Sequence, residues 1–250
     1  MTDETAAFET AAIFETAMRA AIEQADRVKG RTYPNPPVGA VILDPDGKIA
    51  GVGGTEPVGG PHAEVIALRR AGERARGGAA VVTLEPCAHH GRTPPCVDAL
   101  VRAGVSTVVY AVADPNPVAA GGAAKLAESG IEVVAGVLAE QVSGGVLREW
   151  LHRQRTGRPH VTWKYAGSID GRSAAADGTS QWITGPVARA DVHRRRAAAD
   201  AIIVGTGTVF ADNPTLTARL PDGSLADRQP LRVVVGERDI STDANVLNDD

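Results

Sequence analysis

The chain has 250 residues, 43% of them hydrophobic, which is enough for one large domain or two ordinary ones with real cores. Its formal net charge of −4 makes nucleic acid a poor first hypothesis, because proteins that bind polyanions normally present a basic face. The segment MTDETAAFET lacks the basic and apolar regions of a signal peptide, and no apolar run approaches membrane-spanning length. We therefore expect a cytoplasmic protein whose partners include neither membrane nor nucleic acid.

Helical spacing of apolar residues opens the chain and predicts a helix over residues 8–30, with Gly30 as its C-terminal cap. Two strands joined by the turn DPDG follow, over residues 38–43 and 48–54, and predict a hairpin. Helices and strands then alternate: helices are expected over 62–72, 95–104 and 123–130, and strands over 79–86, 105–112 and 131–136. This alternation predicts an α/β fold with a largely parallel sheet covered by helices.

A further helix is predicted over residues 139–157, ending at Gly157, and a new strand-led pattern starts with RPHVTWKYAGSIDG. We place a domain boundary near Arg158, which gives a first domain of residues 1–157 and a second of residues 158–250. In the second domain, strands are expected over 160–169, 201–205 and 231–236. These three strands would form only part of a parallel sheet, and its later strands are not found among the predicted elements.

The stretch PCAHHGRTPPC, residues 86–96, holds the only two cysteines of the chain. In a reducing compartment they are better explained as metal ligands or bystanders than as a disulfide. His62 and Glu64 begin one predicted helix, Cys87 follows a predicted strand, and Cys96 lies in the first turn of another helix. His62, Cys87 and Cys96 would hold zinc through one imidazole and two thiolates, leaving a fourth position for water.

Glu64 is the predicted acid/base group of this site. A bound Zn²⁺ lowers the pKa of its water, and a nearby carboxylate can move protons from that hydroxide to a leaving amine. Zinc deaminases show this arrangement as H-x-E with a later P-C-x-x-C, whereas here eight residues separate the two cysteines. A structural zinc with His89 or His90 as fourth ligand, in a non-catalytic binding module, is the alternative, and it is distinguished by whether Glu64 matters once zinc is bound.

Four stretches, TYPNPPVGAVI, HAEVIAL, TLEPCAHHGRTPPC and ADPNP, in this order resemble the deaminase half of the bifunctional riboflavin-biosynthesis enzyme family. A second set, KYAGSIDGR, SQWIT, GTGTV, DNPTLTAR and RVVVG, resembles the start of the reductase half. The resemblance thus spans essentially the whole chain, and it is far more specific than the zinc motif alone.

The resemblance implies a cytidine-deaminase-like three-layer domain followed by a dihydrofolate-reductase-like α/β domain, which is incomplete here. The first domain would remove an exocyclic amine from a diaminopyrimidinone that carries a ribosylamino 5′-phosphate. The second would reduce the ribosyl unit to ribityl with NADPH. Because the glycine-rich stretch that the family's reductase half uses later is missing, we expect this chain to deaminate but to reduce poorly. A deaminase of another small base or nucleoside is the alternative, although it would lack the appended region.

The resemblance also implies site residues. The deaminase substrate would be held by Asn35, His89, Arg92, Asp114 and Asn116. NADPH would be lined by Ala166, Trp182, Thr208 and Asp212, and the reductase substrate would be contacted by Ser180, Arg196, Leu216 and Arg219. From the residues alone, Trp182 fits a core equally well, Arg196 fits a solvated charge, and GTGT fits a tight turn. Arg92 stands where the family often has Lys and offers phosphate a bidentate fork. A homo-oligomer is compatible with the sequence.

Overall fold

This computed structural model describes residues 2–91 and 93–248. The chain forms two compact units, Met1–Val161 and Thr162–Asp250, so the structural division falls four residues after the expected boundary. Within the described residues, no helix is long and apolar enough to cross a membrane.

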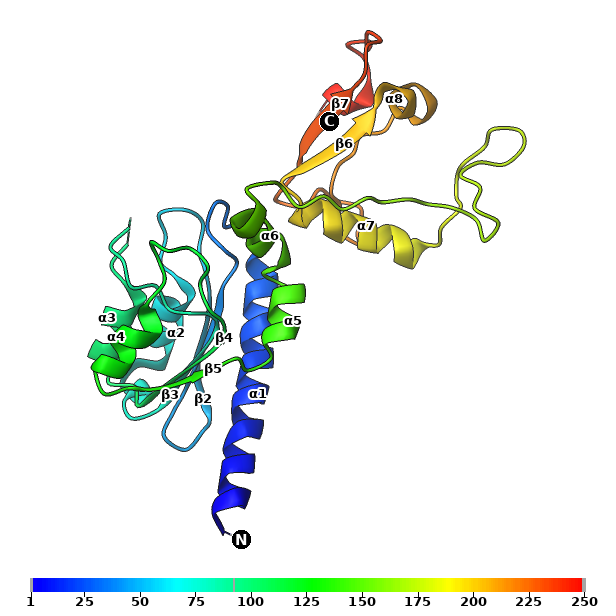
Figure 1. The fold of residues 1–250 in the computed structure, drawn as a ribbon. Coiled ribbons are helices and arrows are strands. Elements are labelled where there is room, and N and C mark those ends of the chain that lie inside the picture. Colours follow the sequence, from blue (N-terminus) through cyan, green and yellow to red (C-terminus); the bar gives the residue numbers. More distant parts are fainter. Residues whose placement is uncertain (1, 92, 249–250) are drawn as a thin grey trace. The chain divides into compact units, whose positions relative to one another are not determined.

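A five-stranded sheet lies at the centre of the first unit (Figure 1). Its strands are β1 (Gly39–Leu43), β2 (Ile49–Gly54), β3 (Ala79–Leu84), β4 (Thr107–Val112) and β5 (Glu132–Ala135), in the order β2-β1-β3-β4-β5. Strand β1 is antiparallel to both β2 and β3, whereas β3, β4 and β5 run parallel. The predicted hairpin is confirmed. The expectation of a largely parallel sheet holds only from β3 onward, because the hairpin pairs with β3 in the antiparallel direction.

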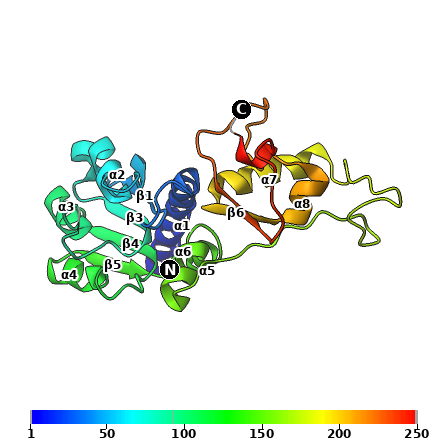
Figure 2. The same ribbon diagram turned by 90° about the horizontal axis from the view of Figure 1, so that it is seen from above.

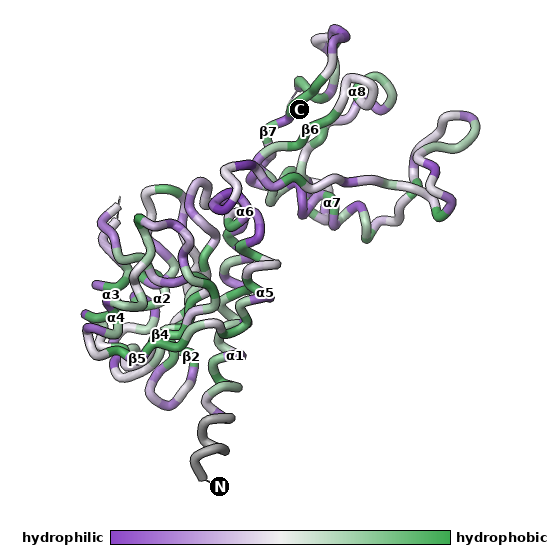
Figure 3. The backbone as a smooth tube through the Cα atoms, viewed as in Figure 1, coloured by the Kyte–Doolittle hydropathy of each residue, from purple (hydrophilic) through white to green (hydrophobic). Residues whose placement is uncertain are grey.

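Helices cover both faces of this sheet, which gives the expected three layers (Figure 2). They are α1 (Thr2–Val28), α2 (Ala63–Ala71), α3 (Cys96–Ala103), α4 (Gly122–Glu128), α5 (Ala139–Gly144) and α6 (Arg148–Thr156), with a 3-10 turn at Gly72–Ala75. Helices α2, α3 and α4 lie on one side of the sheet, and α1 and α5 lie on the other (Figure 1). The strands β1 and β3 are completely buried between these layers, as their apolar sequences require. Figure 3, coloured by residue hydropathy, shows that hydrophobic residues are frequent along the central strands.

Two glycines let the helices approach the sheet closely. A Cβ atom at Gly39 would collide with the carbonyl oxygen of Ala21 in α1, and one at Gly53 would collide with the carbonyl oxygen of Ala63 in α2. The backbone of each helix therefore lies directly against the backbone of a strand. This contact sets the position of the first turn of α2, which follows His62 and contains Glu64.

The single helix predicted over residues 139–157 is wrong, because the structure has two helices, α5 and α6, in its place. The break falls at Gly145, whose backbone angles of φ −108° and ψ −109° are not helical. Glycine favours such a break, because it loses more conformational entropy than other residues when it enters a helix. The end of α6 is as expected, with Gly157 in the left-handed conformation at φ 69°.

The second unit contains a two-stranded parallel sheet, with a small core of Val209, Leu216, Ala244 and Val246. Its elements are β6 (Ala201–Gly205), β7 (Leu231–Val235), α7 (Pro186–Ala198), α8 (Thr206–Asp212) and a 3-10 turn at Asn245–Leu247. The strands expected near 201 and 231 are present, but the strand predicted over 160–169 is not formed. No described neighbour pairs with that segment, and its Val161 and Trp163 side chains are exposed, so its backbone lacks the partner that a strand needs.

Candidate active site

Three element ends of the first unit bring the predicted metal ligands together. His62 immediately precedes α2, Cys87 follows β3, and Cys96 is the first residue of α3. The Nδ1 atom of His62 lies 3.6 Å from Cys87 Sγ and 3.3 Å from Cys96 Sγ. All three donor atoms lie within 4.8 Å of one another, which is close enough for one ion. One imidazole and two thiolates suit zinc, so the residues present fit the expected metal.

The site has the three protein ligands typical of catalytic zinc. Neither His89 nor His90 belongs to the group of metal-binding side chains found among the described residues, and His90 is exposed. A structural zinc would use four protein ligands, whereas catalytic zinc keeps one position for water. The donor set therefore favours the catalytic interpretation of the motif over the structural one.

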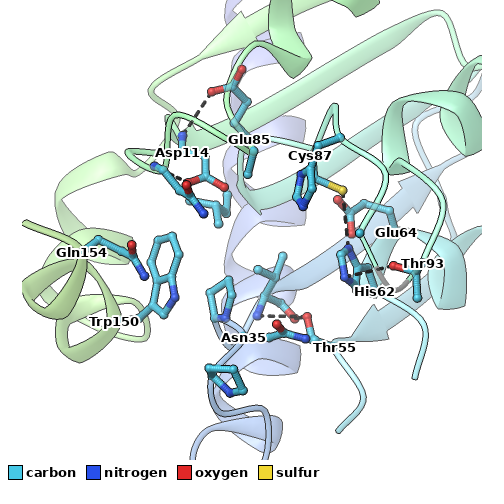
Figure 4. Close-up of a pocket in the computed structure, with 18 of the residues that line it drawn as sticks. Asn35, Thr55, His62, Glu64, Glu85, Cys87, Thr93, Asp114, Trp150 and Gln154 are labelled. Atoms are coloured by element: carbon cyan, nitrogen blue, oxygen red, sulfur yellow. Dashed lines mark hydrogen bonds between the residues drawn. The ribbon is translucent and has the colours of Figure 1, made fainter. Parts of the chain in front are cut away.

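Glu64 lies beside this donor group and is only 4% exposed (Figure 4). Burial raises the pKa of its carboxyl, and the negative charge of Cys87 raises that pKa further. A carboxyl with a raised pKa exchanges protons closer to neutral pH, as a general acid/base group must. The environment of Glu64 thus suits proton transfer.

The two thiols titrate as a pair. The side-chain hydrogen bond with Cys96 lowers the pKa of Cys87 to about 4, although burial opposes this effect. The same hydrogen bond raises the pKa of Cys96. The backbone N–H of Cys96 also donates to Cys87 Sγ at 3.4 Å and so stabilises negative charge on that sulfur. At least one thiolate is therefore available at neutral pH, which is the form that binds metal.

A cavity of about 330 Å³ opens beside the metal ligands. His62, Glu64 and Thr93 lie at one end, and Trp150 and Gln154 lie at the other (Figure 4). Four of the five predicted substrate residues of the deaminase line this cavity: Asn35, His89, Asp114 and Asn116. The fifth, Arg92, lies outside the described residues.

The predicted substrate residues differ in how they are held. Asp114 Oδ1 accepts the backbone N–H of Asn116 at 2.8 Å, and Asn116 Oδ1 accepts that of Val118 at 3.1 Å, so this loop is stabilised by its own side chains. Burial raises the pKa of Asp114. The buried Nδ1 atom of His89 has no hydrogen-bond partner among the described residues, which leaves it available to a ligand.

Sequence reasoning missed Glu85, a buried residue of the cavity wall. Its Oε2 atom accepts the backbone N–H of Asp114 at 3.1 Å, and its Oε1 atom accepts that of Ala123 at 2.9 Å. Its place directly after a buried strand, two residues before Cys87, was the available signal. The partners of its carboxylate are 29 and 38 residues away and were not predictable from spacing.

Trp150 and Gln154 were also missed. Their spacing of four residues within α6 places them on one face of that helix. The segment carried no motif, so only the tertiary structure shows that this face borders the cavity.

In the second unit, three predicted reductase-substrate residues come together near α7. Arg196 Nη1 donates to the carbonyl oxygen of Thr217 at 3.1 Å, which places it beside the segment that contains Leu216 and Arg219. His193, which was not predicted, accepts the backbone N–H of Arg219 at its Nδ1 atom at 3.2 Å. Arg196 is half-buried, and burial lowers its pKa, so it is not simply a solvated charge.

The predicted NADPH residues are less closely associated. Thr208 and Asp212 lie one turn apart on α8. Trp182 is 70% exposed, with the guanidinium of Arg189 4.4 Å from its ring centroid, so it is not a core residue. Ala166, like Ser180 of the substrate set, lies in an irregular segment. No hydrogen bond or ring contact recorded among the described residues joins these loops to α8.

Family models match both parts of the chain. Residues 12–112 match the cytidine and deoxycytidylate deaminase zinc-binding region, and residues 159–250 match the RibD C-terminal domain. The first of these contains all three metal ligands and Glu64. The second starts two residues before Val161, where the first compact unit ends.

Relatives match nearly the whole chain. The riboflavin biosynthesis protein RibD of Mycobacterium tuberculosis H37Rv is 70% identical over 236 residues, which cover 94% of this chain and 70% of that protein. The Escherichia coli K12 protein of the same name is 48% identical and covers 87% of this chain and 62% of its own. This chain therefore spans between three fifths and three quarters of the length of these relatives.

A solved structure agrees. The deaminase/reductase of Thermotoga maritima, described as a diaminohydroxyphosphoribosylaminopyrimidine deaminase and 5-amino-6-(5-phosphoribosylamino)uracil reductase, superposes with a TM-score of 0.83 at 44% identity. The match covers 90% of this chain and 63% of that one. The expected family is thereby confirmed. The chain belongs to the RibD family of riboflavin-biosynthesis proteins, which combine a zinc-dependent deaminase with an NADPH-dependent reductase.

Proposed function

We propose that the first unit hydrolyses an exocyclic amine of 2,5-diamino-6-(5-phosphoribosylamino)pyrimidin-4-one to give the corresponding aminouracil and ammonia. The observation that carries this proposal is the buried carboxyl of Glu64 beside a three-donor metal site, at one end of a cavity. The printed name of the Thermotoga maritima relative supports the choice of substrate.

Zinc, when bound by His62, Cys87 and Cys96, supplies a hydroxide at neutral pH. Glu64 would accept a proton from the attacking water and would then donate a proton to the amine as it leaves. Thr93 Oγ1 lies 3.4 Å from His62 Nε2 and helps to hold the imidazole with its Nδ1 atom toward the thiols. One water is consumed and one ammonia is released for each turnover.

The other residues of the cavity would bind and orient the ring. Asn35 and Asn116 offer amide donors and acceptors, and His89 offers its unpartnered Nδ1 atom. Arg92, by its charge and its fork of donors, would bind the phosphate. Its replacement by Ala should raise KM for the phosphorylated substrate much more than it weakens binding of a dephosphorylated analogue.

For the second unit, we propose a contribution to the NADPH-dependent reduction of the ribosyl group. Arg196 and Arg219 would contact that substrate, together with Ser180 and Leu216. Thr208 and Asp212 of α8 would line the cofactor site, with Ala166 and Trp182. The support is the match to the RibD C-terminal domain and the approach of Arg196 to residues 216–219.

Ammonia release is the decisive test of the deaminase proposal. The diaminopyrimidinone phosphate should be deaminated, whereas cytidine and guanine should not. Turnover of cytidine instead would identify a nucleoside deaminase, and no turnover of any substrate by zinc-loaded protein would favour a zinc-stabilised binding module. We further propose a cytoplasmic location and a small-molecule substrate in place of nucleic acid, in line with the net charge of −4.

A further inference from the structure

Helix α6 supplies the wall of the cavity that lies away from the metal ligands. Trp150 and Gln154 come from this helix and face His62 and Glu64 across the cavity (Figure 4). The helix spans Arg148–Thr156, so it lies between the two segments that match family models, residues 12–112 and 159–250. The zinc chemistry and this opposite wall therefore come from different parts of the chain.

The wall offers hydrogen-bonding groups that the protein itself does not use. Trp150 is half-buried and packs against the core of the first unit, yet its indole N–H has no recorded hydrogen-bond partner among the described residues. Gln154 is exposed, and its amide, which can both donate and accept, likewise has no recorded partner there.

Packing and an ion pair hold helix α6 in place against the first unit. Leu147 and Leu151 on either side of Trp150 are 0% and 1% exposed, so packing sets the rotation of α6. The ion pair between Lys29 Nζ and Glu149 Oε2, 2.9 Å apart, joins α6 to the end of α1. Side chains on a rigid element can recognise a ligand more precisely than those on a loop.

We propose that Trp150 and Gln154 bind the ribosyl unit of the deaminase substrate. This inference rests on the proposed function, which places the reacting carbon of the pyrimidinone beside Glu64. A cavity of about 330 Å³ falls in the range that holds a whole ligand, and so extends beyond a single ring. The part of the substrate remote from the reacting carbon then lies toward α6.

The chemistry of the wall selects the ribosyl unit from the remaining groups. Ribose presents hydroxyls that donate and accept, together with an apolar C–H face. The Gln154 amide complements the hydroxyls in both roles, and the Trp150 indole offers a flat apolar surface and one donor. Neither side chain is charged, so neither would attract the phosphate in preference to water.

The test compares substrates with and without the ribosyl phosphate. KM would be measured for the full ribosylaminopyrimidinone phosphate, and the inhibition constant would be measured for the bare triaminopyrimidinone ring as a competitor. Trp150→Ala and Gln154→Ala should each raise KM for the full substrate, about tenfold for Trp150→Ala, while the inhibition constant of the bare ring changes less than twofold. Trp163→Ala is the matched control, because Trp163 is 83% exposed and lies outside the cavity, and it should change neither quantity.

One further variant, Trp150→Phe, and the exposed position of Gln154 guard against misfolding. Trp150→Phe keeps an aromatic ring but removes the N–H, and it should keep full zinc content and the wild-type melting temperature while raising KM by a smaller factor. Gln154 is exposed, so Gln154→Ala should fold normally. Equal weakening of the full substrate and the bare ring would overturn the inference, as would unchanged constants for both. If the wild-type protein releases no ammonia from the full substrate, the proposed function itself is refuted.

Discussion

Glu85 and Asp114 are joined across the cavity wall, because the Glu85 carboxylate accepts the backbone N–H of Asp114 at 3.1 Å. The same carboxylate accepts the backbone N–H of Ala123 at 2.9 Å, in the first turn of α4. From that helix, Lys125 Nζ donates back to the carbonyl oxygen of Ala88 at 2.8 Å, next to Cys87. The loop that provides a metal ligand and the loop of Asp114, which lines the cavity, are thus connected through α4.

Replacing Glu85 by Gln should loosen this connection. The amide nitrogen of Gln cannot accept a hydrogen bond, so one backbone N–H loses its partner at a cost of about 1–3 kcal/mol in the free energy of unfolding. We expect zinc to be retained and KM for the substrate to rise, as measured by metal analysis, denaturant unfolding and steady-state kinetics. Glu132→Gln is the control, since Glu132 is exposed and accepts only from Thr107 Oγ1 among its recorded hydrogen bonds. Equal effects of the two substitutions would contradict the prediction.

Replacing Glu64 by Gln should abolish most of the deamination without removing zinc. The amide has nearly the same shape but cannot transfer protons, and general acid/base groups are worth ~10²–10⁴ in rate. Initial rates of ammonia release and the zinc content of the purified variant check this expectation. Normal turnover would assign the proton transfer to another group, and loss of the metal would favour a ligand role for Glu64.

Removing the metal should destabilise the first unit as well as inactivate it. The Cys96 side chain is completely buried, so a chelator that removes the metal would leave this buried sulfur without its metal partner. We expect about one zinc per chain, a lower melting temperature after chelation, and recovery of both stability and activity when Zn²⁺ is added. Cys96→Ala should lose most of the zinc. An unchanged metal content in this variant would remove Cys96 from the ligand set.

The Lys29–Glu149 ion pair should make the stability of the first unit depend on pH in the acid range. Burial opposes ionisation of Glu149, but Lys29 and Arg148 together hold its pKa below the usual 4.5. Because the folded-state pKa is lowered, the stabilisation is complete above the unfolded-state pKa and is lost as the pH falls through the folded-state value. Lys29→Met should cost less than about 1 kcal/mol at neutral pH, since the pair is partly exposed. The difference from wild type should disappear in urea unfolding measured well below pH 4.5.

The metal site was predictable because its ligands lie at element ends that the sequence marks. Pro61 and Pro95 each precede a helix, and the buried strand before Cys87 is continuous and apolar. Glu85 and Trp150 were not predictable in the same way. They reach the cavity wall through long-range hydrogen bonds of Glu85 and long-range packing of Trp150, which periodicity does not encode.

Two errors in the fold have local and tertiary causes. Residues 139–157 have helical spacing of apolar residues on both sides of Gly144 and Gly145. This pattern predicts one continuous helix, but the flexible backbone of glycine ends α5 there, and α6 begins separately. Residues 160–169 have the composition of a strand, yet a strand also needs a hydrogen-bonded neighbour, which composition cannot supply.

The glycine at position 53 links the packing of the sheet to the geometry of the candidate active site. Because the carbonyl oxygen of Ala63 occupies the space where a methyl group would be, Gly53→Ala would have to push the start of α2 outward. His62 precedes that turn and Glu64 belongs to it, so both would move together relative to Cys87 and Cys96. The absence of a side chain at one strand residue thereby lets Glu64 lie beside Cys87 (Figure 4).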